Sequence, residues 1–368
     1  MYNIALKLLH KLTDNGFQAY IVGGYTRDLI LDRKTTDIDV CTNATPKQLK
    51  EIFKDSMLPN VEYGSVTVIY HKVRFEITTF RKDIKYENHR LPVKIKYINS
   101  LIEDLKRRDF TINTLCIDQD GNIIDLLNGR CDIDDKIIKM VGNPRYKLKE
   151  DALRILRAIR FATILNFELD PKLKKYIKKY GYLLKDLSYF RKKEELEKLF
   201  LSSNANVGVK LLKELKLDKH LELSNLENLK IVPSILGIWA QLDVEKIYTF
   251  NNNEKDLIKL IKELLNKDVL DEFNLYKYGL YVSTIVGEIK DIDKKIINQK
   301  YNDLPITNKK EIDISAKEIC DLLNKKPNSF LKQIIEDLEY NIVVKNIENK
   351  KEVLKDYIQN KYKDITFN

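Results

Sequence analysis

The chain has few of the residues that build disulfide frameworks or preformed metal clusters. Its 368 residues include four cysteines, at positions 41, 116, 131 and 320, and no two of them form a CxxC pair. The four histidines show no metal-ligand spacing. This scarcity argues against a disulfide-rich secreted scaffold or a zinc site, and it favours reduced thiols in a cytoplasmic protein.

Long apolar runs are also missing. No run approaches membrane-spanning length, and the N-terminus lacks the basic-then-apolar pattern of a signal peptide, so we expect no membrane partner. Basic residues outnumber acidic ones, 65 to 55, which gives a net charge of +10. That excess fits a protein with a nucleic-acid face, although many basic proteins bind no nucleic acid.

The stretch from Ala19 to Asp28 combines a strand, a turn and the start of a helix. Ala19–Val22 is β-prone, Gly23-Gly24 interrupts it, and Tyr25–Asp32 predicts a short helix. A glycine pair ahead of a helix leaves backbone N–H groups that an anion can approach closely. Arg27, in the first turn of that helix, can reach the same anion.

Two carboxylates follow on a strand-like run. Asp37 and Asp39 are two residues apart, so they share one face of a strand while Ile38 and Val40 share the other. Adjacent carboxylates repel unless a cation lies between them, and such oxygen ligands suit Mg²⁺ held together with a substrate's phosphates. Residues 19–40 therefore predict a phosphate cradle beside a metal-binding dyad.

Each half of this unit is common by itself, because a glycine pair usually marks a turn and Asp-x-Asp usually lies on a solvated strand edge. Together and in this order they are far more specific. The run Gly23-Gly24-x-x-Arg27-Asp28 with Asp37-x-Asp39 resembles the signature of bacterial CCA-adding enzymes and poly(A) polymerases, which are polymerase-β-type nucleotidyltransferases. The resemblance implies that Asp37 and Asp39 are catalytic residues and Mg²⁺ ligands, and that Gly24 and Arg27 bind the nucleotide.

Two stretches downstream bear on the same site. Lys72–Phe80 alternates as a strand and makes Glu76 either a third carboxylate beside the dyad or a solvent-facing glutamate. Arg81–Pro92 is polar without a clear period, which predicts a mobile loop. The family has a flexible loop at this position that is needed for the final A addition, and the resemblance therefore disfavours an enzyme that adds only C.

The heptapeptide from Arg107 to Asn113 is a further match and resembles the family's RRDFTxN motif. Adjacent basic residues are usually solvated, but the resemblance favours Arg108 as a contact to the triphosphate or sugar. We expect Asp109 to cap the helix that follows. Asn113 is either a nucleotide contact or a structural amide at a helix end.

Residues 150–165 predict one long helix. Asp151, Arg154, Arg157 and Arg160 recur every third residue along it and form a polar stripe. By itself such a stripe is most often a surface ladder of ion pairs. It resembles the family's EDxxRxxR motif, whose Asp and first Arg read the incoming base.

The chemistry of these side chains fits base reading, because an aspartate only accepts hydrogen bonds and an arginine only donates them. Asp151 can accept the amino proton of cytosine or adenine while Arg154 donates to the ring nitrogen. Guanine and uracil present the opposite polarity at both places, so the pair would select C and A. Arg157 and Arg160 would face phosphates or hold Asp151 in place, and we expect all four residues to contribute to ATP and CTP binding.

Strand patterns give way to long helical periods after about residue 140. We expect an α+β polymerase-β-type head with a mixed sheet at 1–140, followed by an all-α neck at 141–218, body at 219–304 and tail at 305–368. Residues 188–196 resemble the family's ERIxxEL motif imperfectly, and we expect them to support the base-reading helix. Lys325-Lys326 resembles the tail of the Gram-positive bacterial type and is expected to contact a nucleic-acid backbone.

These matches predict template-independent addition of C, C and A to the 3′ end of tRNA by two-metal-ion chemistry. CTP and ATP would be the substrates, pyrophosphate the leaving group, and the 3′ end and acceptor arm of tRNA the parts bound. An A-adding enzyme and a poly(A) polymerase are alternatives with the same chemistry. A catalytically inactive RNA-binding protein is an alternative of another class. The oligomeric state does not follow from the sequence.

Overall fold

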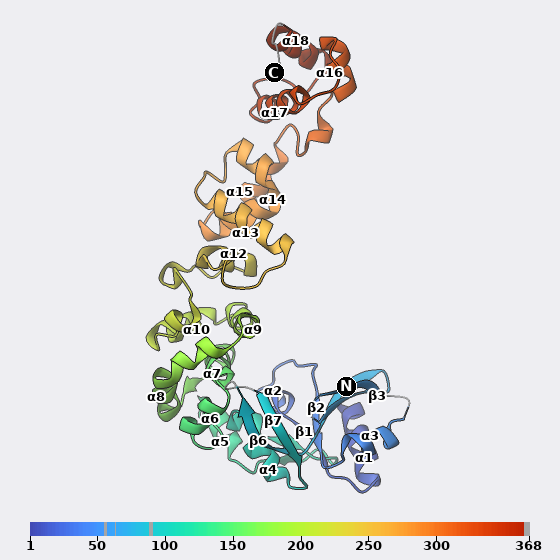
Figure 1. Ribbon diagram of the computed structural model, residues 1–368, viewed down its shortest axis with the longest axis vertical. Helices are drawn as coiled ribbons and strands as arrows, with labels where there is room; N and C mark the ends of the chain where they lie inside the picture. Colours follow the sequence, from blue (N-terminus) through green and yellow to red (C-terminus); the bar gives the residue numbers. More distant parts are fainter. Residues whose placement is uncertain (55–56, 63, 88–90, 364–368) are drawn as a thin grey trace. The chain divides into compact units, whose positions relative to one another are not determined.

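The computed structural model describes residues 1–54, 57–62, 64–87 and 91–363. Two compact units divide the chain, Met1–Glu227 and Asn228–Asn368. The strands lie in the first unit, and the described part of the second unit contains helices only (Figure 1). The predicted fold class, an α+β head followed by helices, is confirmed. The finer division at residues 140, 218 and 304 stays a prediction.

The first unit combines short strands with helices. Its described strands are β1 (Ala19–Val22), β2 (Asp39–Thr42), β3 (Met57–Glu62), β4 (Ser65–Tyr70), β5 (Val73–Thr79), β6 (Arg81–Glu87), β7 (Leu91–Tyr97), β8 (Cys116–Ile117), β9 (Ile123–Ile124), β10 (Ile137–Ile138) and β11 (Glu168–Leu169). Its α-helices are α1 (Tyr2–Asp14), α2 (Gly24–Ile30), α3 (Pro46–Ile52), α4 (Leu101–Lys106), α5 (Gly129–Asp134), α6 (Pro144–Glu150), α7 (Leu153–Leu165), α8 (Pro171–Tyr180), α9 (Tyr189–Phe200), α10 (Ala205–Glu214) and α11 (Asp218–Leu221). The 3₁₀ turns are η1 (Thr111–Asn113), η2 (Gly181–Asp186) and η3 (Leu226–Asn228), the last at the boundary between the units.

The main sheet has the order β3-β4-β5-β2-β1-β8-β9. β2 and β5 run parallel, whereas the other neighbours are antiparallel. In this register Asp39 lies opposite Val22 of β1 on one side and Glu76 of β5 on the other. The end of β1, the start of β2 and the middle of β5 therefore meet at one place.

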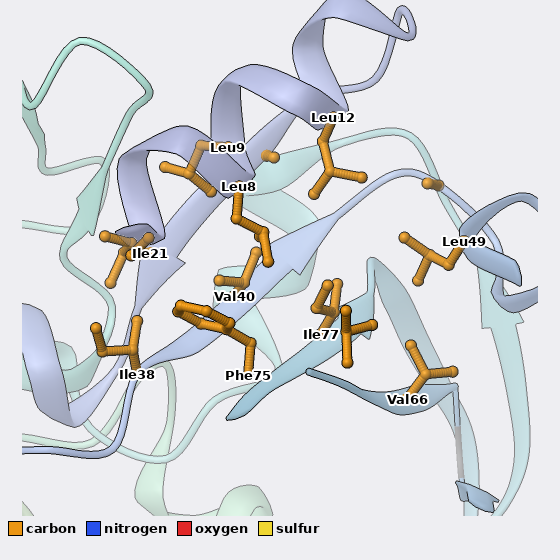
Figure 2. Close-up of a cluster of buried hydrophobic side chains, with 14 of the residues drawn as sticks. Leu8, Leu9, Leu12, Ile21, Ile38, Val40, Leu49, Val66, Phe75 and Ile77 are labelled. Carbon is orange, nitrogen blue, oxygen red and sulfur yellow. The ribbon is translucent and has the colours of Figure 1, made fainter. Parts of the chain in front are cut away.

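The hydrophobic core fixes this register. Figure 2 shows Leu8, Leu9 and Leu12 of α1 packed near Val40 and Phe75, and all five side chains are buried. Burying one such side chain stabilises the fold by about 2 kcal/mol. A one-residue slip of β2 would put a carboxylate in place of Val40 in the core, so burial holds the acidic face of β2 outward.

The prediction of a loop at Arg81–Pro92 is wrong for the residues described there, because they belong to two strands. β6 and β7 pair antiparallel, from Arg81 opposite Tyr97 to Glu87 opposite Leu91. The sequence from Val93 to Tyr97 alternates apolar residues with lysines, a period of two that favours a strand. Polar composition misleads here because a two-stranded ribbon keeps much of its surface in water. Residues 88–90 of the predicted loop lie outside the described part of the chain.

The single helix predicted at 150–165 is also wrong. α6 ends at Glu150, Asp151 has extended φ/ψ values of −142° and 102°, and α7 begins at Leu153. The Asp151 carboxylate accepts a hydrogen bond from the Leu153 amide at 3.0 Å. A short acidic side chain that binds the backbone N–H two residues ahead is a strong helix start signal, so Asp151 begins a new helix instead of continuing the old one.

The second unit is a set of packed helices. Its described elements are α12 (Ile235–Leu242), α13 (Asn252–Leu265), α14 (Glu272–Ile289), α15 (Lys294–Asn302), η4 (Lys309–Glu311), α16 (Ala316–Leu323), α17 (Phe330–Val343) and α18 (Lys351–Tyr362). Trp239, the only tryptophan of the chain, is fully buried against Tyr248 and Phe250. Of the helices described, none combines the length and the apolarity that crossing a bilayer requires.

Candidate active site

The turn between β1 and α2 has the backbone conformation that only glycine adopts readily. Gly23 has φ 86° and ψ −137°, and α2 begins at Gly24. A Cβ on Gly23 would meet the Asp39 carboxylate at 3.6 Å and the Arg108 guanidinium at 3.9 Å, which are ordinary contacts. The backbone angles, not a lack of space, therefore demand glycine here. The turn lies directly beside one acidic and one basic side chain.

The two aspartates of the dyad lie outside the core, as the alternation predicts. Asp37 and Asp39 are exposed, whereas Ile38 and Val40 are buried in the core. Only Asp39 belongs to β2, because the strand begins there and Asp37 lies in the preceding connection. Glu76 is exposed on the neighbouring strand, in register with Asp39. The structure therefore brings a third carboxylate to the dyad.

Negative charge at this place is incompletely neutralised. Desolvation by the surrounding protein and the Glu76 carboxylate raise the pKa of Asp39 to about 6, with a smaller contribution from Asp37, while Arg108 opposes the rise. A divalent cation would relieve this repulsion, so the donor set fits a metal. Within the described residues, no three His, Cys, Asp or Glu side chains form a preformed metal cluster. Oxygen atoms of a bound triphosphate would therefore have to complete the shell, which is usual for Mg²⁺.

A chain of hydrogen bonds links the glycine turn to α7. Arg27 is buried and donates from Nε and Nη2 to the two carboxylate oxygens of Asp28, at 2.8 and 2.9 Å. Its Nη1 donates to Oδ1 of Asn113 at 2.7 Å. Asn113 in turn donates to Asp109 at 3.0 Å, and Asp109 accepts two bonds from Arg157 at 2.8 and 2.5 Å. Five residues from three separate stretches thus form one polar network.

Asp109 accepts hydrogen bonds within this network and does not cap a helix. Its Oδ1 also accepts a hydrogen bond from the Phe110 amide at 2.8 Å, but only the short turn η1 follows, not the predicted capped helix. Burial alone would raise the pKa of Asp109, yet Arg157 and Asn113 hold it well below its ordinary value. Asp109 is therefore an ionised anchor for Arg157.

Arg108 is held by a carboxylate that sequence reasoning missed. Asp104 of α4 is fully buried and accepts hydrogen bonds from Arg107 Nε at 2.8 Å and Arg108 Nη2 at 3.2 Å. The signal was present, because Asp104 lies three and four residues ahead of the two arginines on a helical turn. Nε of Arg108 is buried without a hydrogen-bond partner among the described residues. This guanidinium is thus oriented by Asp104 and keeps donor capacity.

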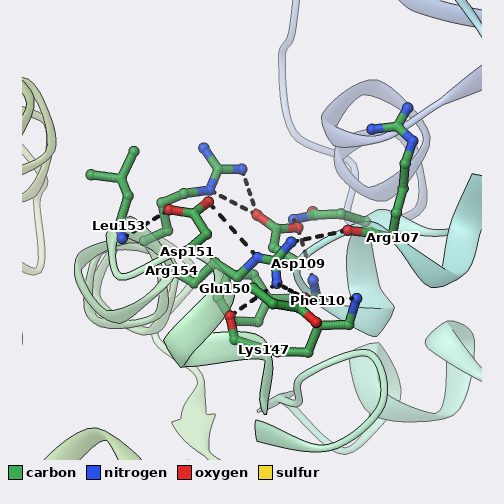
Figure 3. Close-up of polar contacts among 10 residues, drawn as sticks. Arg107, Asp109, Phe110, Lys147, Glu150, Asp151, Leu153 and Arg154 are labelled. Carbon is green, nitrogen blue, oxygen red and sulfur yellow. Dashed lines mark hydrogen bonds and ion pairs between the residues drawn. The ribbon is translucent and has the colours of Figure 1, made fainter. Parts of the chain in front are cut away.

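The proposed base-reading pair lies at the start of α7, as Figure 3 shows. Arg154 is buried, and its Nη1 and Nη2 donate to the carbonyl oxygens of Lys147 and Arg107, both at 3.1 Å. Its Nε lies 3.9 Å from the Asp151 carboxylate, and Nη1 lies 3.4 Å from Glu150. Backbone carbonyls from two other stretches therefore fix the plane of the guanidinium beside Asp151.

One cavity of about 450 Å³ joins these parts. Its wall includes the glycine turn, the acidic strand, the RRD segment and the start of α7; the lining residues are Gly23, Gly24, Arg27, Asp39, Arg108, Asp109, Asn113, Asp151, Leu153, Arg154, Arg157 and Phe161. Of the predicted site residues, the described cavity wall omits Asp37 and Arg160.

Arg160 contacts the cavity wall indirectly, through the ring of Phe161. Arg27, Arg157 and Arg160 place their guanidinium carbons 5.0, 5.4 and 4.2 Å from the Phe161 ring centre. Arg160 pairs with Glu195 of α9 at 2.9 Å, so the segment resembling ERIxxEL supports α7 as expected. The nucleotide contact of Arg160 stays a prediction. The sequence indicates only an apolar helix position at Phe161, and no signal in it predicts a platform for three arginines.

Comparisons with known proteins agree on one family. Residues 19–139 match the model described as Poly A polymerase head domain, residues 166–226 match Probable RNA and SrmB- binding site of polymerase A, and residues 210–358 match tRNA nucleotidyltransferase domain 2. The CCA-adding enzyme of Bacillus cereus (strain 03BB102) is 31% identical over an alignment of 391 positions that covers 98% of each chain. That of Ligilactobacillus salivarius (strain UCC118) is 33% identical over 380 residues, which cover 95% of this chain and 94% of the relative.

A solved structure gives the same result. The crystal structure of the Bacillus stearothermophilus CCA-adding enzyme in complex with CTP is 27% identical and superimposes with a TM-score of 0.87, covering 98% of this chain and 97% of that chain. The similarity in sequence and in fold extends over nearly the whole length of the chain, so it does not depend on any single motif. The chain belongs to the CCA-adding enzyme family of nucleotidyltransferases.

Proposed function

We propose that this protein adds C, C and A to the 3′ end of tRNA, with CTP and ATP as substrates and pyrophosphate as the leaving group. The observation that carries the proposal is the shared cavity, because Asp39 and the Asp151–Arg154 pair line the same wall. One nucleotide could therefore contact an acidic, metal-binding end and a base-reading end together. The relatives named CCA-adding enzyme support the same activity.

The phosphate end is built by the turn and two arginines. Gly23 lies beside Asp39 and Arg108, Gly24 lies beside Arg27, and all of them line the same cavity. In this proposal Arg27 and Arg108 neutralise the triphosphate, while Asp28 and Asp104 hold their guanidinium groups in place. The catalytic contribution of these residues is position and charge, since nucleotidyl transfer needs no covalent protein intermediate.

The family implies a divalent metal ion, and we propose Mg²⁺, held by Asp37 and Asp39 together with the triphosphate. Glu76, in register with Asp39, adds to the negative field there. When bound, Mg²⁺ would lower the pKa of the attacking 3′-hydroxyl and neutralise charge on the departing pyrophosphate. The carboxylates of Asp37 and Asp39 would hold the metal, and their negative charge would attract it to the site.

The base end discriminates by hydrogen-bond polarity. Asp151 would accept from the amino group of cytosine or adenine, and Arg154 would donate to the ring nitrogen. The two backbone carbonyls that hold Arg154 keep its guanidinium from turning to suit guanine or uracil. Arg157 would contact the nucleotide from its anchor on Asp109, and Arg160 would act beside it through Phe161.

The basic charge of the chain and its C-terminal part suit contacts to tRNA. The net charge of +10 suits an RNA partner, and the predicted tail at 305–368 carries Lys325-Lys326 shortly before α17. We propose that the tail contacts the tRNA backbone while the 3′ end and acceptor arm reach the cavity. The protein would then act in the cytoplasm, where its four free cysteines stay reduced.

Incubation of the purified protein with tRNA lacking its 3′ CCA, Mg²⁺ and each nucleotide tests the proposal. We expect CTP alone to extend the tRNA by two residues, and CTP with ATP by three. Asp39→Ala should lower incorporation by about 1,000-fold or more while tRNA binding persists. Use of ATP but not CTP would instead favour an A-adding enzyme or poly(A) polymerase, and absence of any incorporation would favour an inactive RNA-binding protein.

A further inference from the structure

The side chain of Asn113 lies between a cation and an anion. It is buried in η1, its Oδ1 accepts from Arg27 Nη1 at 2.7 Å, and its Nδ2 donates to Asp109 Oδ1 at 3.0 Å. A guanidinium can only donate and a carboxylate can only accept, so the orientation of this amide is dictated by its partners. Neither a carboxylate nor a hydrocarbon of the same size can satisfy both neighbours.

The two neighbours of Asn113 belong to the two ends that the proposed function assigns to the cavity. Arg27 follows the glycine turn at the phosphate end, and its Nε and Nη2 also donate to Asp28. Asp109 anchors Arg157 of α7 at the base end. Arg27, Asn113, Asp109 and Arg157 all line the cavity wall. The amide of Asn113 is thus a direct polar connection between the two ends.

We infer that Asn113 is a positioning residue that fixes the spacing between the triphosphate-binding turn and the base-reading helix. The inference rests on the proposed function, since it assigns the two ends of the cavity to one nucleotide. Asn113 acts through Arg27 and Asp109. By holding them in one register, it makes the enzyme accept only a nucleotide whose base meets Asp151 and Arg154 when its phosphates meet the turn.

The two ends depend on Asn113 unequally. Without the amide, Arg27 keeps its two bonds to Asp28, so the phosphate end changes little. Asp109 keeps only the Phe110 amide on Oδ1, and Arg157 loses part of the support of its anchor. Removal of Asn113 therefore loosens the base end, and alignment should suffer more than nucleotide affinity.

The test uses the full-length protein with N113L, which removes both bonds, and N113D, which keeps the acceptor for Arg27 but turns a carboxylate toward Asp109. Asn43 provides matched controls, N43L and N43D, because its Oδ1 accepts the Gln18 amide at 2.8 Å in the same unit and it is not among the residues that line the described cavity. For each variant we would measure kcat and KM for CTP incorporation, the CTP-to-UTP preference in binding and in turnover, the affinity for tripolyphosphate with Mg²⁺, and the thermal midpoint.

We expect N113L and N113D to lower kcat by about 10- to 100-fold, with KM for CTP changed by less than about threefold, because small misplacements cost rate before affinity. The CTP-to-UTP preference should fall in both variants, whereas tripolyphosphate affinity should change by less than about twofold. The Asn43 variants should keep wild-type kcat and preference even where the thermal midpoint falls.

Two results would overturn the inference. One is folded N113L and N113D proteins with wild-type kcat and wild-type preference. The other is a parallel loss of tripolyphosphate affinity, kcat and thermal midpoint that the Asn43 variants share. If the wild-type protein incorporates no nucleotide, the proposed function fails, but the binding preference for CTP over UTP and the tripolyphosphate affinity still decide whether Asn113 couples the two ends.

Discussion

Asp39 is a carboxylate placed where its ionised form is disfavoured. Desolvation and the neighbouring Glu76 raise the pKa of Asp39 to about 6. Asp39 stays at this position because Ile38 and Val40, on the opposite face of the chain, are buried in the core. The burial of the alternate residues thus holds a repulsive pair of carboxylates together. Such stored repulsion is typical of sites that a cation completes.

The change Asp39→Asn should stabilise the metal-free protein at pH 7. The native pKa lies above the unfolded one, so native protein holds the proton between about pH 4 and 6 and loses stability as pH rises through that window. Above pH 6 the ionised Asp39 carboxylate lowers the free energy of unfolding by on the order of 1 kcal/mol, after discounting for solvent exposure. Thermal unfolding at pH 4 and pH 7 would measure the effect, which should vanish at pH 4.

Added Mg²⁺ provides the control for this prediction. It should stabilise the wild-type protein at pH 7 and leave Asp39→Asn nearly unchanged, because the ion binds the native carboxylates only. A metal-free Asp39→Asn protein that melts below the wild type at pH 7 would contradict the charge repulsion on which the proposed metal site depends.

At the scale of elements, the break between α6 and α7 decides how Asp151 and Arg154, the proposed base-reading pair, are placed. A continuous helix would carry Asp151 on the same stripe as Arg154 with its side chain free. The observed break instead ties one carboxylate oxygen of Asp151 to the Leu153 amide at 3.0 Å. Asp151 therefore has two tasks, to begin α7 and to face the cavity.

The variants Asp151→Asn and Asp151→Ala separate these tasks. Asn keeps a capping oxygen, so it should hold stability within about 0.5 kcal/mol, whereas Ala should lose about 1 kcal/mol. Both should lower the preference for CTP over UTP by about 10-fold or more, because a fixed acceptor next to the amino group is removed. Chemical denaturation and competitive incorporation would measure the two effects.

Equal stability of the two Asp151 variants would show that the carboxylate does not cap α7. Asp170, which caps α8 through the Leu173 amide at 2.9 Å, is the matched control. Asp170→Ala should lose similar stability and keep the wild-type preference for CTP, since it does not line the described cavity.

At the scale of the whole molecule, the sites proposed for nucleotide and for tRNA belong to different parts of the sequence. The cavity is complete within Met1–Glu227, whereas the predicted tRNA-binding tail belongs to Asn228–Asn368. The net charge of +10 adds a long-range attraction for a polyanion. The two substrates should therefore respond differently to salt.

Raising KCl from about 50 to about 200 mM should weaken tRNA binding by about 10-fold or more, because released counterions drive that step. KM for CTP should change by less than about threefold, since the groups proposed to bind it are close together. The slope of the logarithm of the tRNA binding constant against the logarithm of the KCl concentration is the salt slope. Replacing Lys325 and Lys326 by Gln should reduce this slope by about one for each phosphate contact that is lost. Filter binding across a salt series would measure the slope.

The pair Lys255 and Lys259 of α13, replaced by Gln in the same way, removes equal charge from outside the predicted tail. An equal change of slope in both double variants would mean that the tail contributes only net charge and no local contact.

The sequence by itself determined the order of elements around the site and the chemistry available there. The glycine turn, the alternation of Asp37 and Asp39 with core residues, and the stretch at 107–113 depend on local backbone geometry, which short spacing encodes. The α+β head followed by helices was predictable for the same reason, as periodicity changes from two to 3.6 near residue 140.

Only the tertiary structure decided which charged groups meet. Asp109 holds Arg157, 48 residues away, and Arg160 turns to Glu195 instead of the cavity wall. Partner choice depends on distances through space, which closure of the chain sets and no local pattern records. The helix break at Asp151 was missed because a side-chain hydrogen bond to the Leu153 amide outweighed the helical periodicity. The β6–β7 hairpin was missed because its cross-strand pairing joins a polar segment without a clear period to the strand that follows it.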